Sequence, residues 1–313
     1  MTGSDKSLRP ILIAGPTASG KSSLALEIAS ALGGVIINAD ALQVYAGWRV
    51  LTARPSREDE MAHPHHLYGH VPMDVAYSVG QWLRDLKPVL EQSPAVRPII
   101  VGGTGLYFSA LTEGLVDIPP IPDDVRAEGD TIRQSAPEQF AKDLQHWDQV
   151  ILSRIDQKNP ARMQRAWEVY RATGTPLSAW QDNTGPADLP LAEVTAICLR
   201  PDPDWLNRRI ARRFAEMLDQ GAIEECLAAR AAGLRPEWPS ARALGATELL
   251  AYANNEMSQA TAMDRATIAT RQFAKRQRTW FRSRMGEWSQ FDIGHGSTST
   301  GLRDAVLAEI TRT

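Results

Sequence analysis

The sequence predicts an α/β fold, with a parallel sheet as its core, a helical insertion and a helical C-terminal part. Three observations predict it. Short apolar runs end in turns that carry glycine or aspartate, stretches with helical spacing follow these runs, and a long middle segment shows helical spacing alone. With 313 residues, the chain is also long enough for a core domain and an inserted part.

The first elements alternate as crossover helices between parallel strands require. The apolar run at 10–14 predicts a strand, 22–32 a helix, 35–37 a second strand, and 98–101 a third strand that leads into another helix. In such sheets, ligands bind at the carboxyl ends of the strands. We therefore expect the functional site at the turns that follow these three strands.

A proline-rich segment at 118–122 interrupts this pattern and is typical of a linker. Beyond it, helical spacing continues to 173, a last strand is expected at 194–199, and helices are expected at 205–230 and 260–284. The predicted parts are the first part of the core at 1–118, a helical insertion at 119–186, the completion of the core with basic helices at 187–290, and a flexible link with a short terminal helix at 291–313.

Composition narrows the class of protein. Hydrophobic residues make up 43% and charged residues 23% of the chain, which is ordinary for a globular protein and argues against disorder. The two cysteines, Cys198 and Cys226, are too few for a disulfide framework or a four-thiolate zinc site. The sequence has neither an apolar leader nor a long apolar stretch, so we expect a cytoplasmic monomer without membrane contact.

The net charge of −3 hides a segregation of charge along the chain. Residues 264–284 contain seven basic side chains and one acid, so the rest of the chain carries about −9. This asymmetry favours one surface that meets an anion, although a solvated helix face has the same composition.

The strongest local signal is a phosphate-binding loop between the first strand and the first helix. Its residues fit the pattern G-x-x-x-x-G-K-[ST] and are Gly15, Pro16, Thr17, Ala18, Ser19, Gly20, Lys21 and Ser22. The glycines let backbone N–H groups converge on phosphate oxygens, and the helix N-terminus adds the positive end of its dipole. Lys21 supplies a cation, and the Ser22 hydroxyl is a ligand for Mg²⁺. The core is therefore expected to be P-loop NTPase-like.

A carboxylate, Asp40, follows the second strand. At this edge of the sheet a carboxylate binds Mg²⁺ or takes a proton from a nucleophile, but aspartate is also a favoured helix N-cap. The third strand ends in the turn at 102–105, which offers backbone N–H groups or the Thr104 hydroxyl to a ligand. A tight turn alone is an adequate explanation of its glycines.

Three histidines, His63, His65 and His66, suggest a zinc site at first sight. Structural zinc sites usually take two separated ligand pairs, and no cysteine lies near these histidines in the sequence. We interpret the segment as a structural or substrate-facing loop.

Two predicted helices carry basic residues in patterns that suit anions. One carries Arg208, Arg209, Arg212 and Arg213. Because arginine binds phosphate bidentately, one of these four is a candidate clamp for a diphosphate. On the last long helix, basic side chains share one face: Arg271, Lys275, Arg278 and Arg282.

This basic ridge suits a nucleic-acid backbone better than a small ligand. The aromatic residues of the same helix, Phe273, Trp280 and Phe281, are expected to point toward a core. In the insertion, Arg162 and Arg165 repeat the basic pattern on a smaller scale.

Together these motifs resemble the bacterial tRNA dimethylallyltransferases, also called tRNA isopentenyl transferases. The shared segments are GPTASGKS at 15–22, DALQVY at 40–45, HPHHL at 63–67, GGTGLY at 102–107, NPARMQRAWEVY at 159–170, GTPLS at 174–178, RRIARRF at 208–214 and TRQFAKRQRTWFR at 270–282. They appear in the family's order and span most of the chain, which makes them far more specific together than singly.

The resemblance implies that the P-loop holds dimethylallyl diphosphate with Mg²⁺ and does not hydrolyse ATP. The implied acceptor is the exocyclic amine of the adenine 3′ of the tRNA anticodon, flipped into a channel. Asp40 then corresponds to the general base, and Thr17 and Arg209 to catalytic residues that contact the diphosphate. The positions that match tRNA contacts are Asp40, Ala41, Leu42, Gln43, Thr104, Arg126, Ala161, Arg162, Met163, Gln164, Arg165, Arg242, Ala243, Leu244, Gly245, Ala246, Thr247, Lys275, Arg276, Gln277, Arg278, Thr279, Trp280, Phe281 and Arg282.

The sequence also departs from the family pattern. Ala41 stands in place of a serine, Arg49 reverses an acidic charge, Arg54 replaces a lysine, and Ala246 stands where an aromatic residue is common. Three other functions remain open: a small-molecule P-loop kinase, an isopentenyltransferase that acts on free AMP or ATP, and a non-catalytic RNA-binding protein. The insertion and the basic helix favour tRNA over a free nucleotide, and the intact Asp40 and P-loop favour an enzyme.

Overall fold

The computed structural model describes residues 8–92 and 95–312. It divides into two compact units: unit 1 joins the chain up to Thr112 with Leu189–Thr313, and unit 2 is Glu113–Asp188. Each unit has buried apolar clusters of its own.

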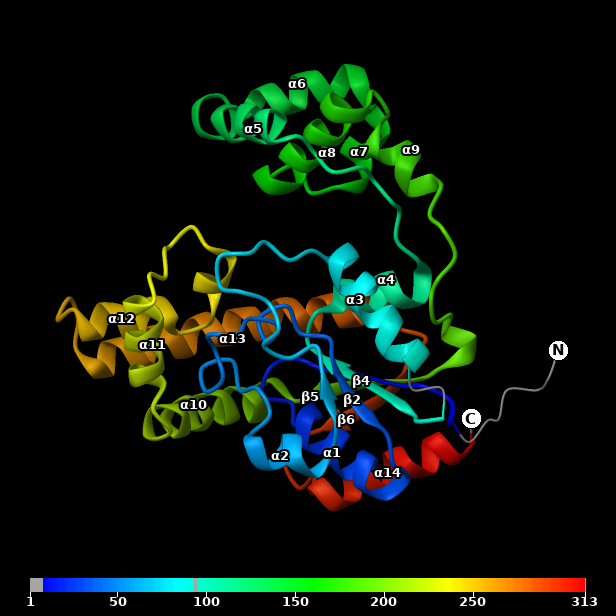
Figure 1. The fold of residues 1–313 in the computed structure, drawn as a ribbon, viewed down its shortest axis with the longest axis vertical. Coiled ribbons are helices and arrows are strands. Elements are labelled where there is room, and N and C mark those ends of the chain that lie inside the picture. Colours follow the sequence, from blue (N-terminus) through cyan, green and yellow to red (C-terminus); the bar gives the residue numbers. More distant parts are fainter. Residues whose placement is uncertain (1–7, 93–94, 313) are drawn as a thin grey trace. The chain divides into compact units, whose positions relative to one another are not determined.

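Unit 1 is built on a six-stranded parallel sheet in the order β3-β2-β4-β1-β5-β6 (Figure 1). The strands are β1 (Ile11–Ala14), β2 (Val35–Asn38), β3 (His65–His66), β4 (Pro98–Gly102), β5 (Thr195–Pro201) and β6 (Ser289–Ile293). β1 lies between β4 and β5, with Ile11 opposite Ile99 on one side and Thr195 on the other. The turns after β1, β2 and β4 therefore meet at one edge of the sheet.

The four strands predicted from apolar runs are present, and the sheet adds two that the sequence did not indicate. β3 has two residues, and β6 reads SQFDI, without an apolar run. The predicted boundary between 290 and 291 was wrong, because it cuts through β6, which pairs with β5 at the edge of the sheet. The helix α14 (Ser299–Arg312) follows this strand.

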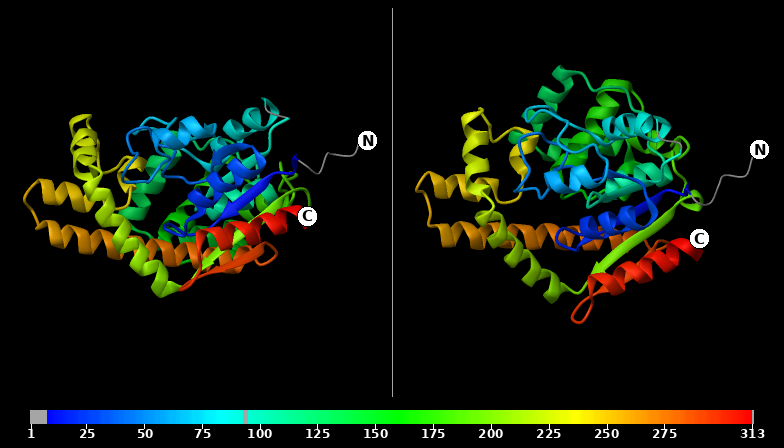
Figure 2. Two further views of the ribbon diagram at one scale, coloured as in Figure 1. Left: turned by 90° about the horizontal axis from the view of Figure 1, so that it is seen from below. Right: turned by 60° about the horizontal axis from the view of Figure 1, so that its bottom comes forward.

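Alternation along the strands divides their side chains between two buried faces of the sheet. Ile11 and Ile13 lie on the face that α1 (Lys21–Leu32) and α14 cover. These two helices run side by side in Figure 2. The other face, with Leu12 and Ala14, is covered by α3 (Val79–Gln92), α4 (Gly105–Glu113) and the C-terminal end of α13 (Gln259–Arg284). Because both faces are buried, the inner strands read as continuous apolar runs.

A second apolar cluster of unit 1 is mostly helical. Around Trp48 it gathers side chains of α10 (Pro203–Asp219), α11 (Ala222–Ala231), α12 (Ala246–Ala253) and α13. The single helix predicted at 205–230 is two helices, because Gly221 adopts a left-handed conformation (φ 94°) between α10 and α11. Short elements complete the unit: α2 (Arg57–Ala62), η2 (Leu191–Glu193) and η3 (Pro239–Arg242).

Unit 2 is helical and contains the segment 119–186. Its helices are α5 (Asp123–Ser135), α6 (Glu138–Trp147), α7 (Gln149–Arg154), α8 (Pro160–Thr173) and α9 (Leu177–Asp182). In α8, the Asn159 side chain caps the N-terminus, Pro160 occupies the first turn, and Gly174 (φ 70°) ends the helix. Its Trp167 packs against Phe140 of α6 at the centre of the unit.

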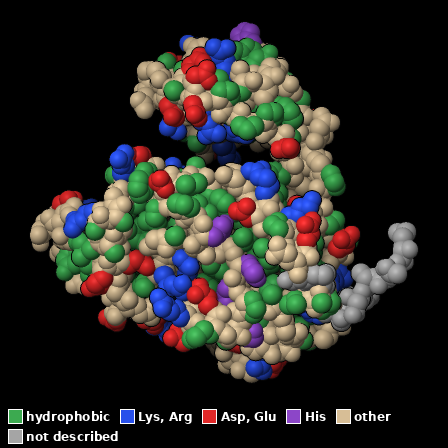
Figure 3. Space-filling view, viewed as in Figure 1, with side chains coloured by type: hydrophobic (Ala, Val, Ile, Leu, Met, Phe, Trp, Pro, Cys, Tyr) green, Lys and Arg blue, Asp and Glu red, His purple; other side chains and the backbone are tan. Residues whose placement is uncertain are grey.

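Charge is mixed on the face of unit 1 that Figure 3 shows, where Lys and Arg side chains lie among Asp and Glu. Over the residues that the structure describes, no helix is both long enough and apolar enough to cross a bilayer.

Candidate active site

The loop between β1 and α1 has the geometry of an anion site. Ala18 (φ 62°) and Gly20 (φ 93°) lie in the left-handed region, and the Ser19 N–H donates to the Pro16 carbonyl at 3.1 Å. α1 begins at Lys21 with no side-chain cap and no acidic residue in its first turn. Among the described residues, no side chain therefore caps the first N–H groups of this helix, which remain available to an anion.

Lys21 is buried within this loop, and its Nζ donates to the Pro16 carbonyl at 3.4 Å. Burial lowers the pKa of Lys21 to about 8, with the Asp40 carboxylate opposing this shift and the Arg213 guanidinium adding to it. A bound diphosphate would stabilise the charged ammonium form. The loop thus holds a cation whose charge is best satisfied by an anionic ligand.

The helix α10 brings two arginines to the same loop. A guanidinium nitrogen of Arg209 lies 3.8 Å from where a Cβ on Gly20 would stand, and the Arg209 guanidinium stacks over the Trp205 ring at 5.1 Å. Arg213, one helical turn further, lines a cavity together with Lys21. The sequence alone did not separate Arg213 from its three neighbours. Its spacing of four residues from Arg209 was the available signal, because it places both side chains on one face.

Asp40 lies in a turn after β2, so the helix N-cap interpretation was wrong. Its Oδ1 accepts the Leu42 N–H at 3.0 Å, and its own N–H donates to the Asn38 side chain at 2.8 Å. Within residues 8–92 and 95–312, Oδ2 accepts no hydrogen bond. One carboxylate oxygen thus holds the loop, while the other is available to take a proton.

The turn after β4 bonds to the two residues on either side of Asp40 and so holds Asp40 in place. The Thr104 N–H donates to the Ala39 carbonyl at 3.1 Å, and the Thr104 hydroxyl accepts the Ala41 N–H at 2.9 Å. Gly102 is required for this approach, because a Cβ there would lie 2.0 Å from the Ala39 oxygen. The Thr104 hydroxyl, which the sequence suggested as a ligand contact, therefore also bonds to the protein backbone.

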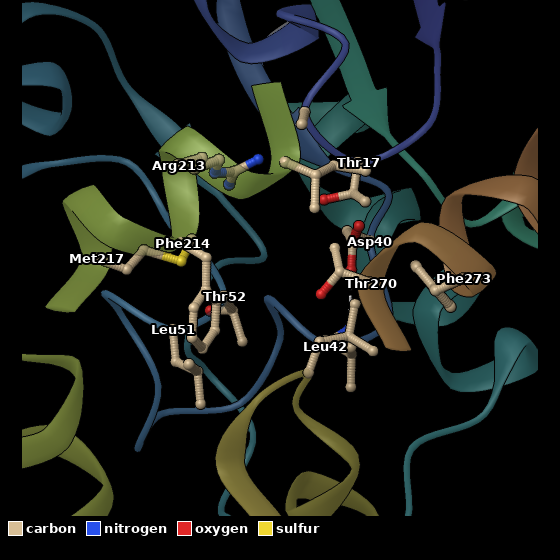
Figure 4. A pocket seen from close by; sticks show the side chains of 13 residues that line it. Thr17, Asp40, Leu42, Leu51, Thr52, Arg213, Phe214, Met217, Thr270 and Phe273 are labelled. Carbon is tan, nitrogen blue, oxygen red and sulfur yellow. Dashed lines mark hydrogen bonds between the residues drawn. The ribbon is translucent and has the colours of Figure 1, made fainter. Parts of the chain in front are cut away.

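One cavity of unit 1 joins these polar groups to an apolar wall (Figure 4). Thr17, Asp40 and Arg213 lie along one side of the cavity in this view. Leu51, Phe214 and Met217 form the apolar wall on another side. Phe273 also lines the cavity, so the prediction that it points toward a core was wrong. A cation, an acid and an apolar wall in one cavity suit an organic group that carries an anion.

The apolar wall depends on the loop at 46–56, which side chains from distant segments hold. The Glu225 carboxylate accepts three consecutive backbone N–H groups, from Arg49, Val50 and Leu51, at 2.5, 3.0 and 2.8 Å. The buried Gln43 donates to two carbonyls of the same loop, each at 2.9 Å. Arg49, a departure from the family pattern, is paired with Glu60 at 3.2 Å. The altered loop is therefore well anchored.

The residues around the P-loop fit Mg²⁺. The Ser22 hydroxyl is on an exposed side chain in the first turn of α1 and lines the same cavity as Asp40. Among the described residues, no three His, Cys, Asp or Glu side chains gather as a metal cluster. Magnesium suits such a sparse set, because it takes oxygen ligands and usually keeps substrate phosphates and water in its shell.

The histidine segment forms β3 at the edge of the sheet. His63 shares a hydrogen bond with the Ser30 hydroxyl at 2.8 Å, and His65 shares one with the His63 carbonyl at 2.8 Å. Burial lowers the pKa of His65, whose ring packs edge-on against Tyr68. These contacts favour the structural interpretation of the segment.

The positions that the resemblance assigns to tRNA contact differ in exposure. Exposed or half-exposed side chains belong to Asp40, Ala41, Leu42, Thr104, Arg126, Ala161, Arg162, Arg165, Arg242, Leu244, Thr247, Lys275, Arg276, Arg278, Thr279, Trp280 and Arg282. The buried residues are Gln43, Met163, Gln164, Ala243, Gly245, Ala246, Gln277 and Phe281. For the buried set, direct contact with RNA stays a prediction, and these side chains offer little surface in this structure.

Known proteins resemble this chain over most of its length. A family model described as IPP transferase matches residues 43–284. The tRNA dimethylallyltransferase of Jannaschia sp. (strain CCS1) is 57% identical over 289 residues, which cover 91% of this chain and 96% of that protein.

Two solved structures share the fold. The full-length tRNA isopentenylpyrophosphate transferase from Bacillus halodurans is 26% identical with a TM-score of 0.67, and the match covers 97% of each chain. A eukaryotic dimethylallyltransferase acting on tRNA is 24% identical with a TM-score of 0.79, and the match covers 97% of this chain and 79% of that one. The P-loop and Asp40 precede residue 43 and lie outside the match to the family model.

Proposed function

The chain belongs to the IPP transferase family, and from this premise we propose that it is a tRNA dimethylallyltransferase. It transfers the dimethylallyl group of dimethylallyl diphosphate to the exocyclic amine of the adenine 3′ of the tRNA anticodon and releases diphosphate. The observation that carries the proposal is one cavity in which Thr17 of the P-loop, the carboxylate of Asp40 and an apolar wall meet.

The diphosphate of the donor binds at the P-loop. Backbone N–H groups at the start of α1 receive its oxygens, and Lys21, Arg209 and Arg213 supply positive charge. The dimethylallyl group lies against the apolar side chains of Leu51, Phe214 and Met217. The Ser22 hydroxyl would hold Mg²⁺, which would supply further positive charge at the diphosphate.

The transfer step breaks one bond and forms another. The amine nitrogen bonds to the first carbon of the dimethylallyl group, while the bond from that carbon to the diphosphate oxygen breaks and leaves its electron pair on the diphosphate. Asp40 takes the amine proton on Oδ2 and orients the nitrogen. Lys21 and the arginines stabilise the charge that develops on the leaving group, and such electrostatic stabilisation is usually a large contribution to an enzymatic rate.

The tRNA binds along exposed basic side chains. Lys275, Arg278 and Arg282 share a face of α13, and Arg162 and Arg165 lie exposed on α8. Flipping the adenine out of its stack costs a few kcal/mol, which such phosphate contacts offset. The proposal includes an enzyme that works as a monomer, in the cytoplasm where tRNA is.

The test is a transfer assay with the purified protein, Mg²⁺ and labelled dimethylallyl diphosphate. In parallel reactions the acceptor is unmodified tRNA or AMP. Label in tRNA alone supports the proposal, whereas label in AMP indicates a free-nucleotide isopentenyltransferase. Productive ATP turnover without use of the prenyl donor would indicate a kinase and end the proposal.

A further inference from the structure

Gln277 is the buried amide in a run of basic residues on α13. Its side chain is 6% exposed, while Lys275 and Arg276 before it are exposed. Burying an amide is unfavourable unless its hydrogen bonds are made. The burial therefore indicates a specific partner for both ends of this amide.

Both ends are bonded to the backbone of turns that form the candidate site. The Thr17 N–H of the P-loop donates to Gln277 Oε1 at 2.8 Å. Gln277 Nε2 donates to the Gly103 carbonyl, after β4, at 2.8 Å. These partners fix which end of the amide is oxygen and which is nitrogen, because the reverse orientation would oppose donor to donor and acceptor to acceptor.

The amide also lies beside the carboxylate that the transfer uses. A Cβ on Gly103 would stand 2.4 Å from Gln277 Nε2 and 3.2 Å from Asp40 Oδ2. Both groups therefore face the same side of Gly103, and the space between them admits no larger residue. Gly103 in turn precedes Thr104, whose N–H and hydroxyl bond the residues on either side of Asp40.

We propose that Gln277 is a positioning residue, which sets the distance between the P-loop at Thr17 and the general base Asp40 by tying both to α13. The inference rests on the proposed transfer reaction. It replaces the RNA contact that the resemblance assigned to this position, because the amide is buried and bonded at both ends to protein backbone. A misplacement of about 1 Å between donor and acceptor can cost about 10²-fold in rate, so this distance matters for transfer.

Two substitutions distinguish a positioning role of the Gln277 hydrogen bonds from a packing role of its side chain. Gln277→Leu keeps the size of the side chain and removes both hydrogen bonds. Gln277→Glu still accepts the Thr17 N–H, but it cannot donate to Gly103 and places a negative charge on the Asp40 side of that glycine. The matched control is Gln272→Leu, an exposed glutamine on the same helix.

The first measurement is steady-state transfer to tRNA. We expect Gln277→Leu to lower kcat by about 10²-fold, with tRNA affinity unchanged. In Gln277→Glu, which keeps the bond to Thr17 and loses the one to Gly103, we expect a smaller loss of kcat. Wild-type kcat in both variants, or a loss confined to tRNA affinity, would overturn the proposal.

The second measurement does not depend on transfer. Amide hydrogen exchange of the peptide that contains Thr17 is expected to be faster in Gln277→Leu than in wild type or in Gln272→Leu, since the Thr17 N–H loses its acceptor. Unchanged exchange there would overturn the proposal. If the wild-type protein transfers no label to tRNA, the proposed function fails, but the hydrogen-exchange test of the Gln277 bond to Thr17 still stands. If Gln277→Leu does not fold, Gln277→Asn, one methylene shorter, takes its place with the same expectations.

Discussion

Arg213 and Asp40 line one cavity from two elements, α10 and the turn after β2, and their charges act on each other. Burial and the neighbouring Arg209 lower the pKa of Arg213, and Asp40 opposes this shift. A desolvated guanidinium interacts strongly with any anion placed next to it. Arg213 is thus placed to respond to a diphosphate in the cavity, alongside the Arg209 that the family resemblance assigns to that role.

Replacing Arg213 should therefore slow transfer. We expect Arg213→Ala to lower kcat/KM for dimethylallyl diphosphate by about 10²-fold, the usual effect of removing one group that stabilises developing charge. Arg213→Lys should recover only part of the rate, because an ammonium group cannot bind phosphate bidentately. The control is Arg212→Ala, whose exposed guanidinium is paired with Glu216 at 3.3 Å. Equal rates in Arg213→Ala and Arg212→Ala would contradict the role of Arg213.

Asp40→Asn tests the base without disturbing the loop. The asparagine side-chain oxygen still accepts the Leu42 N–H, so the turn is retained, but the amide takes no proton. We expect the single-turnover transfer rate to fall by about 10²- to 10⁴-fold, while tRNA binding in a filter or gel-shift assay is unchanged. A wild-type transfer rate in Asp40→Asn would exclude Asp40 as the general base.

The basic face of α13 should carry tRNA affinity rather than chemistry. We expect the double substitution Lys275→Ala with Arg278→Ala to weaken tRNA binding and to reduce the slope of log affinity against log salt by about 1 for each phosphate that the protein no longer neutralises. Arg303→Ala with Arg312→Ala, on α14, removes the same charge from another helix. If the α13 and α14 double variants change the slope equally, the effect comes from net charge, and the assignment of tRNA contact to α13 is wrong.

The sequence predicted those parts of the site that are encoded locally. The P-loop and Asp40 could be placed because each lies within a few residues of the strand that positions it. Gln277 and Glu225 could not, because their roles depend on partners far along the chain: the Gln277 bond to Thr17 spans 260 residues, and the Glu225 bond to Arg49 spans 176. β6 was missed for a related reason, since an edge strand that is half-exposed needs no apolar run.

A substitution at Gly245 tests whether this residue shapes the cavity wall or contacts RNA. A Cβ at this position would lie 2.7 Å from the ring of Phe214 and 3.4 Å from Leu51, two residues of the apolar wall. We expect Gly245→Ala to raise KM for dimethylallyl diphosphate while tRNA affinity stays the same, because the wall must shift. Gly233→Ala is the control: its φ of 89° matches the 91° of Gly245, but nothing lies within 4 Å of its Cβ.

Both glycine variants should lose about 1–2 kcal/mol of stability, since both place alanine in the left-handed region. Chemical denaturation measures this shared loss, and only Gly245→Ala should add the change in donor KM. Weaker tRNA binding with an unchanged donor KM would return Gly245 to the RNA-contact set.

The pH dependence of kcat/KM for dimethylallyl diphosphate should report the ionisation of Lys21. Its pKa is lowered by burial to about 8 in the free enzyme, so the ammonium form is lost as the pH rises through that value. Since kcat/KM reports ionisations of the free enzyme, we expect kcat/KM for dimethylallyl diphosphate to decline above about pH 8. At saturating donor the decline of kcat should begin at higher pH, because the bound diphosphate stabilises the charged amine. Lys21→Arg should be less active but should not show the decline, because a guanidinium stays charged throughout this range. A profile that stays flat through pH 8 in wild type, or the same decline in Lys21→Arg, would assign the ionisation to another group.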